Sequence, residues 1–252
     1  KKFFKKENKK LLLINRNTII DQNLFIPAGF NVVIKENEKI NLINKAFIIS
    51  KSPWQIGGLE QRTFIGGFKN NPGGGLLIKD TNTPSLIQNT HFSYLSGFDL
   101  TSSKEFNILG SINFYEADVK VYNTDFENIY SEDAINIFRS NFEIDKNNYK
   151  NIASDAIDID FSKGEIKSSK FENIKNDAID FSGSDAIVKS SEFKSIKDKV
   201  ISVGEKSKVT ISKIYAVNSH AGIVSKDGST VVSNNIKFDK VLIPFSAYQK
   251  KK

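Results

Sequence analysis

Residues 155–161 read DAIDIDF and residues 176–184 read NDAIDFSGS, so the motif DAID returns after 22 positions. In both stretches apolar residues alternate with carboxylates, which is typical of a strand with one buried and one exposed face. Ile157 and Ile159 are predicted to point inward, and Asp158 is predicted to point outward between them. A motif that returns at a fixed interval indicates a repeat architecture.

The same period extends through the second half of the chain. An isoleucine column keeps this period after a first step that is one position longer, and it comprises Ile112, Ile135, Ile157, Ile179, Ile201 and Ile223. An aromatic column keeps it to within one position, and it comprises Phe126, Tyr149, Phe171, Phe193, Tyr215 and Phe238. NTHFSYL at 89–95 resembles NTDFENI at 123–129, which predicts that Phe92 joins the aromatic column and that a loop at about 97–109 bulges outward. Two columns with one period indicate a solenoid, in which each unit buries one face against its neighbours.

The composition of each unit selects the type of solenoid. Apolar residues recur with period two, β-branched residues dominate, and clusters of Ser, Asn, Gly and Asp separate the runs. These features indicate short strands and turns, and the lack of a sustained helical period excludes helical repeats. We therefore expect an all-β fold, a single-stranded right-handed parallel β-helix with about 22 residues and three strands per coil. Over residues 112–243 the pattern resembles the pectin-lyase-like superfamily.

The two ends of the chain differ from the repeat. Residues 1–30 are expected to form a basic tail and an N-terminal cap, because a solenoid needs its open apolar end covered. Residues 31–246 are expected to form the β-helix, and residues 247–252 a basic C-terminal tail. Trp54, the single tryptophan, is assigned to the core or the cap rather than to a sugar-binding surface.

Composition narrows the classes of function. The net charge is +7, but the six lysines and one glutamate of residues 1–10 and the three lysines of residues 250–252 together give +8. The rest of the chain is close to neutral, so a basic groove for nucleic acid is not expected, and no apolar run is long enough to span a membrane. The absence of cysteine excludes disulfides and thiolate chemistry. The chain begins at Lys1 and contains no methionine, so we expect a piece of a longer protein whose targeting segment lies elsewhere.

Parallel strands of successive coils lie about 4.8 Å apart, so outward residues one period apart stack into rows. The outward row comprises Asn113, Asn136, Asp158, Asp180 and Ser202, and the row at the turn entering the strand comprises Asp133, Asp155, Asp177 and Lys199. Asp160 shares the face of Asp158. Carboxylates at turns accept hydrogen bonds from nearby backbone N–H groups, so the turn row has a structural interpretation in which Lys199 pairs with Asp177.

The outward row also has a functional interpretation. Like charges directly opposite on a sheet are destabilising, so Asp158 and Asp180 either share a proton or bind a hard cation such as Ca²⁺. Ca²⁺ is the one cofactor that the sequence suggests, with Asp158 and Asp180 as its candidate ligands. The candidate ligand-binding residues of this face are Asn136, Asp158, Asp160, Asp180 and Ser202.

Two functions fit these rows. The favoured hypothesis is a non-catalytic extracellular or cell-surface module that recognises a polysaccharide or cell-surface glycan, or serves as a rigid scaffold. The alternative is a polysaccharide lyase or glycoside hydrolase acting on an acidic polysaccharide, because glycosidases use paired carboxylates. Its candidate catalytic residues are Asp155, Asp158, Asp177, Asp180, Lys199 and His220. The first hypothesis is favoured because the chain has only three arginines, at 16, 62 and 139, and no basic cluster that would neutralise an acidic substrate.

Motifs of known β-helix families match in part. Polygalacturonases of this fold carry NTD, DD, GHG and RIK coils; SDAID and NDAID resemble the first two, SHAG at 219–222 resembles the third one coil late, and no RIK follows. A broader resemblance is carried by DKVISVGEKS (198–207), GIVSKDGS (222–229), AYQKK (247–251), IPAGF and SPWQIGG. These strings are similar to β-helix modules of large bacterial proteins, some of which also carry a CotH-like kinase domain. The resemblance implies a secreted bacterial parent protein as the partner of this module, and it supplies no catalytic residues.

Overall fold

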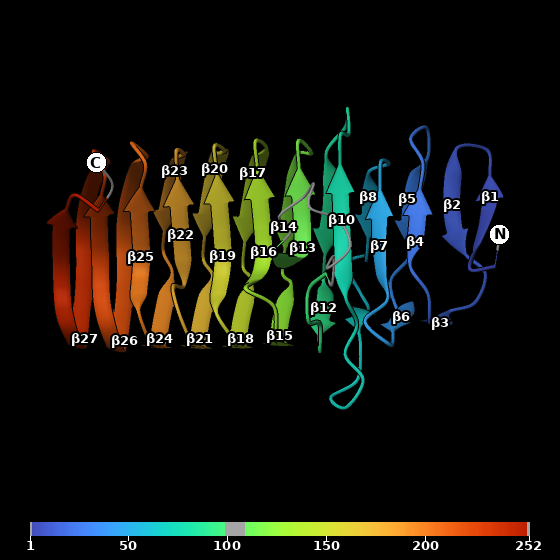
Figure 1. Ribbon diagram of the computed structural model, residues 1–252, viewed down its shortest axis with the longest axis horizontal. Coiled ribbons are helices and arrows are strands. Elements are labelled where there is room, and N and C mark those ends of the chain that lie inside the picture. The colour runs from blue at the N-terminus through green and yellow to red at the C-terminus, as the bar shows by residue number, and fades with distance from the viewer. Residues whose placement is uncertain (1, 99–108, 251–252) are drawn as a thin grey trace.

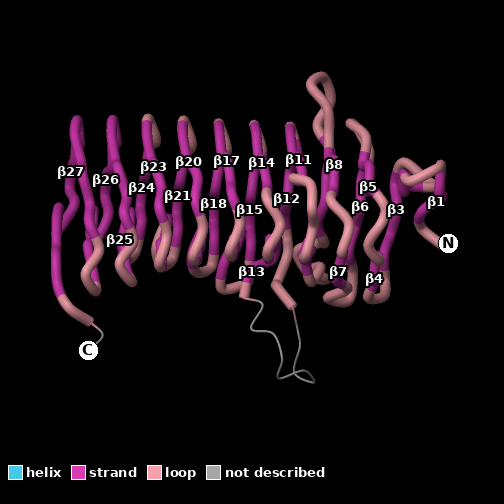
Figure 2. The backbone as a smooth tube through the Cα atoms, turned by 90° about the horizontal axis from the view of Figure 1, so that it is seen from above, coloured by secondary structure: helices cyan, strands magenta, loops and turns pink. Residues whose placement is uncertain are grey.

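The computed structural model describes residues 2–98 and 109–250, and these residues form strands and turns. The strands stack in coils along the long axis of the molecule, with the N-terminal strands at one end and the C-terminal strands at the other (Figure 1). Successive coils lie side by side along this axis (Figure 2). Asp133 pairs in parallel register with Asp155, its counterpart one repeat later in the sequence. The predicted all-β parallel β-helix is therefore confirmed, and the described residues include no helix that could cross a membrane.

Each coil contributes one strand to each of three faces, which we call side A, side B and side C. Side A consists of β4 (Leu24–Ile26), β7 (Phe47–Ser50), β10 (Gly75–Lys79), β13 (Gly110–Tyr115), β16 (Asp133–Phe138), β19 (Asp155–Asp160), β22 (Ile179–Ser182) and β25 (Lys199–Gly204). Side B consists of β2 (Lys10–Leu13), β5 (Asn31–Ile34), β8 (Trp54–Ile56), β11 (Ser85–Gln88), β14 (Val119–Tyr122), β17 (Asn141–Asp145), β20 (Lys163–Lys167) and β23 (Asp185–Lys189). Side C consists of β3 (Asn17–Ile20), β6 (Lys39–Leu42), β9 (Thr63–Gly66), β12 (Thr90–Ser93), β15 (Asp125–Ile129), β18 (Asn148–Ile152), β21 (Lys170–Ile174) and β24 (Glu192–Ile196).

The ends of the solenoid differ from the expected boundaries. β1 (Phe4–Glu7) pairs antiparallel with β2, and this hairpin covers the N-terminal end. β3 and β4 already pair in parallel with β6 and β7, so the winding begins before residue 31. At the other end, β26 (Lys208–Lys226) and β27 (Thr230–Tyr248) each run continuously through a coil, and β27 extends into the segment expected to be a tail.

Two further expectations concern the N-terminal half. Trp54 is fully buried and its ring lies edge-on to Phe4 with the centroids 6.4 Å apart, so it belongs to the core beneath the N-terminal hairpin. The predicted loop at 97–109 lies mostly outside the described residues.

The corners between the sides are made by single residues in the left-handed conformation. Arg139, Lys146 and Asn151 occupy the three corners of one coil, with φ angles of 47°, 58° and 56°. Asparagine adopts this conformation more readily than most residues, and the corner at the end of β15 uses it repeatedly. There the amide of Asn151 donates to Asn128 at 3.1 Å and the amide of Asn173 donates to Asn151 at 2.7 Å. The corners are therefore stacked from coil to coil just as the strands are.

Buried serines satisfy the backbone where the chain leaves side A. The N–H of Ser140 donates to Oγ of Ser162 at 3.0 Å, and the N–H of Ser162 donates to Oγ of Ser184 at 3.0 Å. The hydroxyl of Ser162 in turn donates to the carbonyl of Asp160 at 2.8 Å. Buried backbone groups need hydrogen-bond partners because water cannot reach them. The serine ladder supplies these partners and so stabilises the corner.

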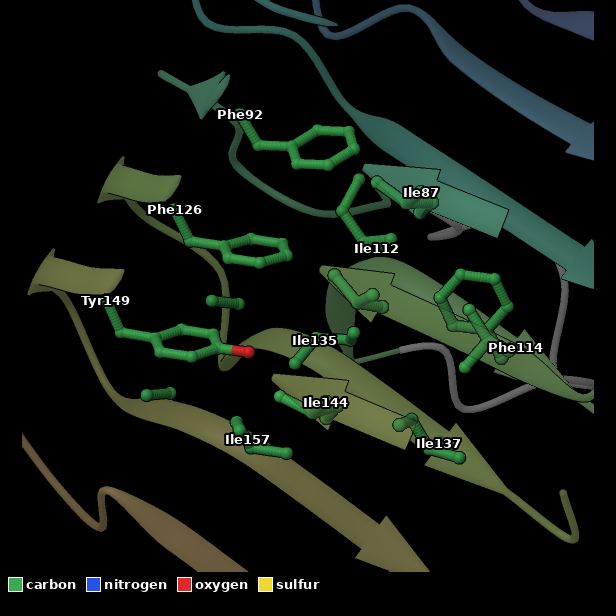
Figure 3. Packing of buried hydrophobic residues seen from close by; sticks show 14 of the residues in the cluster. Ile87, Phe92, Ile112, Phe114, Phe126, Ile135, Ile137, Ile144, Tyr149 and Ile157 are labelled. Carbon is green, nitrogen blue, oxygen red and sulfur yellow. The ribbon is translucent and has the colours of Figure 1, made fainter. Parts of the chain in front are cut away.

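Aromatic rings stack along the interior. Successive centroid distances are 5.1, 4.8, 4.8 and 4.7 Å along the series Phe92, Phe126, Tyr149, Phe171 and Phe193. Figure 3 shows the first three of these rings pointing inward beside the buried isoleucines. The predicted isoleucine column is in register from Ile112 to Ile223. This dry column fills the space between the three sides.

The predicted aromatic column is wrong at Tyr215. Phe193 pairs with Ala216, so the alanine takes the inward position and Tyr215 points outward, 36% exposed. The cause is one extra residue at the preceding corner, where Glu205 and Lys206 both adopt the left-handed conformation. The aromatic stack therefore ends at Phe193.

Replacement of Phe171 by alanine is expected to lower the free energy of unfolding by about 3–5 kcal/mol, because it removes a ring from the middle of the stack and leaves a cavity. Tyr215→Ala is the matched control and is expected to cost less than about 1 kcal/mol, since surface substitutions have small effects. Denaturant unfolding followed by circular dichroism measures both. Equal losses in the two variants would contradict the observed register.

Candidate functional site

Side A carries the predicted polar row in the predicted register. Asn136 on β16 pairs with Asp158 on β19, which pairs with Asp180 on β22, which pairs with Ser202 on β25. The isoleucines on either side of Asp158 are fully buried. Because side chains alternate across a strand, the inward isoleucines force these polar groups onto the outer surface of side A.

The turn row has the backbone role that its position predicts. Oδ1 of Asp155 accepts the N–H of Asp177 at 2.7 Å, and Oδ1 of Asp177 accepts the N–H of Lys199 at 2.9 Å. The Lys199 ammonium also lies 3.2 Å and 3.3 Å from the two oxygens of Asp177. Burial raises the pKa of Asp177 to about 6, and the Lys199 charge opposes that rise. These contacts explain Asp155, Asp177 and Lys199 as links between coils.

Asp133 and Asp158 are the most strongly perturbed carboxyls of the site. Burial raises the pKa of Asp133 to about 8, with a further contribution from the Asp155 charge. One oxygen of Asp133 is buried and has no hydrogen-bond partner in the described part of the chain. Burial, followed by the Asp133 charge, also raises the pKa of Asp158 well above its usual range. At neutral pH Asp133 therefore favours the protonated form, and the surroundings of Asp158 act in the same direction.

A neutral Asp158 fits its contacts. The amide of Asn136 donates to Oδ2 of Asp158 at 2.9 Å, which leaves the other oxygen of the carboxyl able to carry the proton. A protonated carboxyl both donates and accepts hydrogen bonds. The outward row thus presents amide and carboxylic acid groups of similar shape and capacity.

Sequence reasoning missed a buried lysine on this face. Nζ of Lys226 lies 3.8 Å from Oδ1 of Asp180, and the lysine side chain is 10% exposed. A Cβ added to Gly204 would lie 3.4 Å from Cε of Lys226, so the lysine stem runs across this glycine. The sequence does contain a sign of this lysine: Asp160, Ser182, Gly204 and Lys226 follow one another at the period of the repeat, which places Lys226 on side A.

An aromatic pair borders the polar row, and sequence reasoning missed it as well. Tyr115 and Phe138 occupy consecutive positions in the row that continues to Asp160, and their rings stack with the centroids 4.6 Å apart. The Arg139 guanidinium lies 5.0 Å from the centroid of Phe138. Aromatic rings with a cation over the ring face, next to hydrogen-bonding groups, are features of ligand-binding surfaces.

The remaining candidates take other positions. Ser202 is fully buried, and its hydroxyl has no hydrogen-bond partner among the described residues. Asn113 is also buried, and its side chain bonds both the N–H and the carbonyl of Gly110. His220 is exposed and lies within β26, next to Ala221. Asn136, Asp158, Asp160 and Asp180 are therefore the members of the candidate set that remain partly accessible on side A.

Metal binding requires more oxygen ligands than the row provides in this conformation. Ca²⁺ takes six to eight oxygen ligands, and the described residues contain no group of three His, Cys, Asp or Glu side chains arranged for a metal ion. The Lys226 ammonium already supplies a positive charge beside Asp180. Ca²⁺ binding at Asp158 and Asp180 stays a prediction, and it would have to compete with Lys226.

Comparisons with known proteins identify the fold. No protein-family model matches the sequence, and no curated protein matches it. The structure of the periplasmic alginate epimerase AlgG is similar with a TM-score of 0.52 and 9% identity, over 99% of this chain and 80% of that chain. A double mutant of AlgG has a TM-score of 0.52 and 10% identity, over 99% of this chain and 79% of that chain. The catalytic unit of a GH87 alpha-1,3-glucanase from Streptomyces thermodiastaticus has a TM-score of 0.46 and 10% identity, over 86% of this chain and 62% of that chain. At these identities the AlgG structures show a shared β-helix fold.

The raised pKa values make stability depend on pH. In the unfolded chain an aspartate titrates near 3.9, whereas the folded values are about 8 for Asp133 and about 7 for Asp155. Folding therefore favours the protonated forms, so their contribution to stability is complete below about pH 4 and is lost as the pH rises to about 8. Urea unfolding at pH 5 and pH 8.5 is expected to show the lower stability at pH 8.5.

Asp133→Asn provides the specific test, because an amide keeps the neutral shape and has no proton to lose. This variant is expected to be more stable than the wild type at pH 8.5, by on the order of a few kcal/mol, and to have a flatter pH profile. Asp239→Asn, on the exposed β27, is the control and should follow the wild type. Parallel profiles for the wild type and Asp133→Asn would contradict the raised pKa.

Proposed function

We propose that side A is a polysaccharide-recognition surface and that the chain is a non-catalytic glycan-binding module of a larger extracellular or cell-surface protein. The observation that carries this proposal is the polar row of Asn136, Asp158 and Asp180 running beside the stacked rings of Tyr115 and Phe138. Sugar hydroxyls donate and accept hydrogen bonds, and the edges of the two rings, whose faces are covered by each other and by Lys79 and Arg139, offer apolar contact. A surface with both features in adjacent rows suits a carbohydrate.

The repeat of the surface suits a polymer. Its polar groups recur at the spacing of parallel strands, about 4.8 Å, so a linear polysaccharide can make equivalent contacts on successive coils. A protonated Asp158 neither repels an acidic polymer nor leaves hydroxyl groups without partners. The shared fold adds support, since AlgG, by its name, acts on the polysaccharide alginate.

One observation favours a second candidate function, a lyase or hydrolase acting on an acidic polysaccharide. Asp158 favours its protonated form, and the neighbouring Asp180 lies beside the Lys226 ammonium. Carboxyls whose environments differ in this way serve as acid and base in enzymes. Lys226 also supplies the basic side chain that the sequence analysis did not find on this face.

Two substitutions at Asp158 distinguish recognition from catalysis. Asp158→Asn reproduces the protonated carboxyl in shape, so a recognition surface is expected to keep its glycan affinity within about threefold, whereas Asp158→Ala should lose about tenfold. An enzyme is expected to lose about 10²–10⁴-fold in turnover in Asp158→Asn, because an amide cannot transfer the proton. A glycan array gives retention, and assays for new reducing and unsaturated ends give cleavage.

Asp239→Asn serves as the control for both readouts, since this carboxylate is exposed on β27. Cleavage of any array polymer by the wild type that disappears in Asp158→Asn would replace the recognition proposal with the enzymatic one. Retention of no glycan, with no product, would contradict both.

Ca²⁺ is proposed as a conditional ligand of Asp158 and Asp180. Removal of the competing ammonium in Lys226→Ala is expected to increase the rise in melting temperature that millimolar Ca²⁺ produces, because a ligand of the native state stabilises it by mass action. The measurement is thermal unfolding with and without Ca²⁺, with Mg²⁺ as the ion control. An absent or identical shift in the wild type and Lys226→Ala would contradict a Ca²⁺ site here.

A further inference from the structure

Phe161 lies at the corner between side A and side B in an unusual state. Its φ is 49°, in the left-handed region, and its side chain is 53% exposed. For a bulky residue this conformation is a genuine outlier. The equivalent corner of the next coil uses Gly183, at φ 61°, which adopts it without strain. Glu116 and Arg139 hold the same corner of the preceding coils in the same left-handed conformation, so what distinguishes Phe161 is its large exposed ring.

The next coil leaves space for the ring. A Cβ added to Gly183 would lie 2.6 Å from Cδ1 of Phe161, so any larger residue at 183 would displace the ring from this position. Phe138 meets Phe161 edge-on, with the centroids 5.8 Å apart. The ring is thus held from two sides while much of its surface stays open to solvent.

A polar hollow of about 350 Å³ adjoins the ring and is lined in part by Arg139, Phe161, Lys163, Gly183 and Asp185. A second hollow of about 480 Å³ lies next to it on side B, and Lys163 and Asp185 line both. Ligand pockets in proteins commonly measure 300–1,000 Å³. The two hollows together leave room for more than one sugar ring.

The charges around the first hollow favour an anion. Lys163 has no ion-pair partner among the residues the structure describes, and it lies in register with Asp185, which lies in register with Lys208. Arg139 contacts Glu116 at 3.6 Å, but its side chain remains 57% exposed and able to turn toward a ligand. A guanidinium binds a carboxylate through two parallel hydrogen bonds.

We propose that this corner hollow is a second carbohydrate site, distinct from side A, which binds a uronate residue of an acidic polysaccharide. The Phe161 ring packs on the face of the sugar, Arg139 and Lys163 hold its carboxylate, and Asp185 accepts hydrogen bonds from its hydroxyls. The adjoining hollow on side B also carries Glu143 and Glu165, which repel a carboxylate, so the uronate is placed in the first hollow alone. The site needs no contribution from Asp158 or Asp180.

The test is isothermal titration calorimetry of the full chain with oligogalacturonate and with the same oligosaccharide after reduction of its carboxyl groups. Phe161→Asn removes the ring and places a residue that tolerates the left-handed conformation. It is expected to unfold at the wild-type temperature or higher and to weaken binding at the corner by about tenfold or more. Phe64→Asn, on side C, is the aromatic control and should bind as the wild type does.

Charge recognition has its own variants. The double substitution Arg139→Gln and Lys163→Gln is expected to weaken oligogalacturonate binding by about tenfold or more and to reduce its dependence on salt. Lys150→Gln, on side C, is the control and should change neither the affinity for oligogalacturonate nor its salt dependence. The reduced, neutral oligosaccharide is expected to bind weakly to all forms.

Stoichiometry separates this site from side A. If side A also binds the oligosaccharide, two sites are expected in the wild type and one in Phe161→Asn. If side A does not bind it, one site is expected in the wild type and none in Phe161→Asn. Unchanged binding in Phe161→Asn, equal affinity for the neutral oligosaccharide, or the absence of oligogalacturonate binding would each overturn the corner site and leave the proposal for side A untouched.

Discussion

The register between successive coils is the constraint on which the rest of the structure depends. Stacked rings 4.7–5.1 Å apart fill the interior, and the isoleucine column runs beside them in strict pairing. A slip of one residue would turn every inward side chain outward. The extra residue at Glu205 and Lys206 shifts the pairing offset from 22 to 23 residues through sides B and C, and one residue fewer before Ala221 restores it, so Ile201 still pairs with Ile223 on side A. Outward residues have no freedom in this arrangement: their rows follow from what the interior requires.

Register also forces carboxyl groups together, and three different contacts compensate for the repulsion. Asp155 and Asp177 accept backbone N–H groups from the following coil. Asp133 favours retention of its proton, since burial and neighbouring carboxyls disfavour its charge. Asp180 lies beside the ammonium of Lys226. In each case a backbone N–H, a retained proton or an ammonium group offsets the negative charge. The acidic rows are therefore compatible with a stable solenoid, and its stability depends on pH.

The sequence predicted the parts of the fold and the site that follow from a constant period. The DAID frame placed Asn136, Asp158 and Asp180 in one row, and its turn row led to the contact between Lys199 and Asp177. Tyr215 was misplaced because a constant period cannot register an added corner residue, although the asparagine at 218, where the other coils have an aliphatic residue, was a sign of the shift. Lys226 was missed because it reaches back across a glycine to another row.

At two places on the surface a long side chain lies across a glycine of a neighbouring coil. Many corners elsewhere use asparagine or serine ladders, and others use a left-handed residue such as Arg139 or Lys146. Lys226 instead runs across Gly204, and the ring of Phe161 lies against Gly183. Both departures lie at the edge of side A nearest side B, in the row of Asp160 and at the adjoining corner. The polar row, the aromatic pair and the corner hollow therefore form one continuous tract, so a polysaccharide that leaves side A at this edge meets the cationic hollow next, and the two proposed sites can act on a single chain.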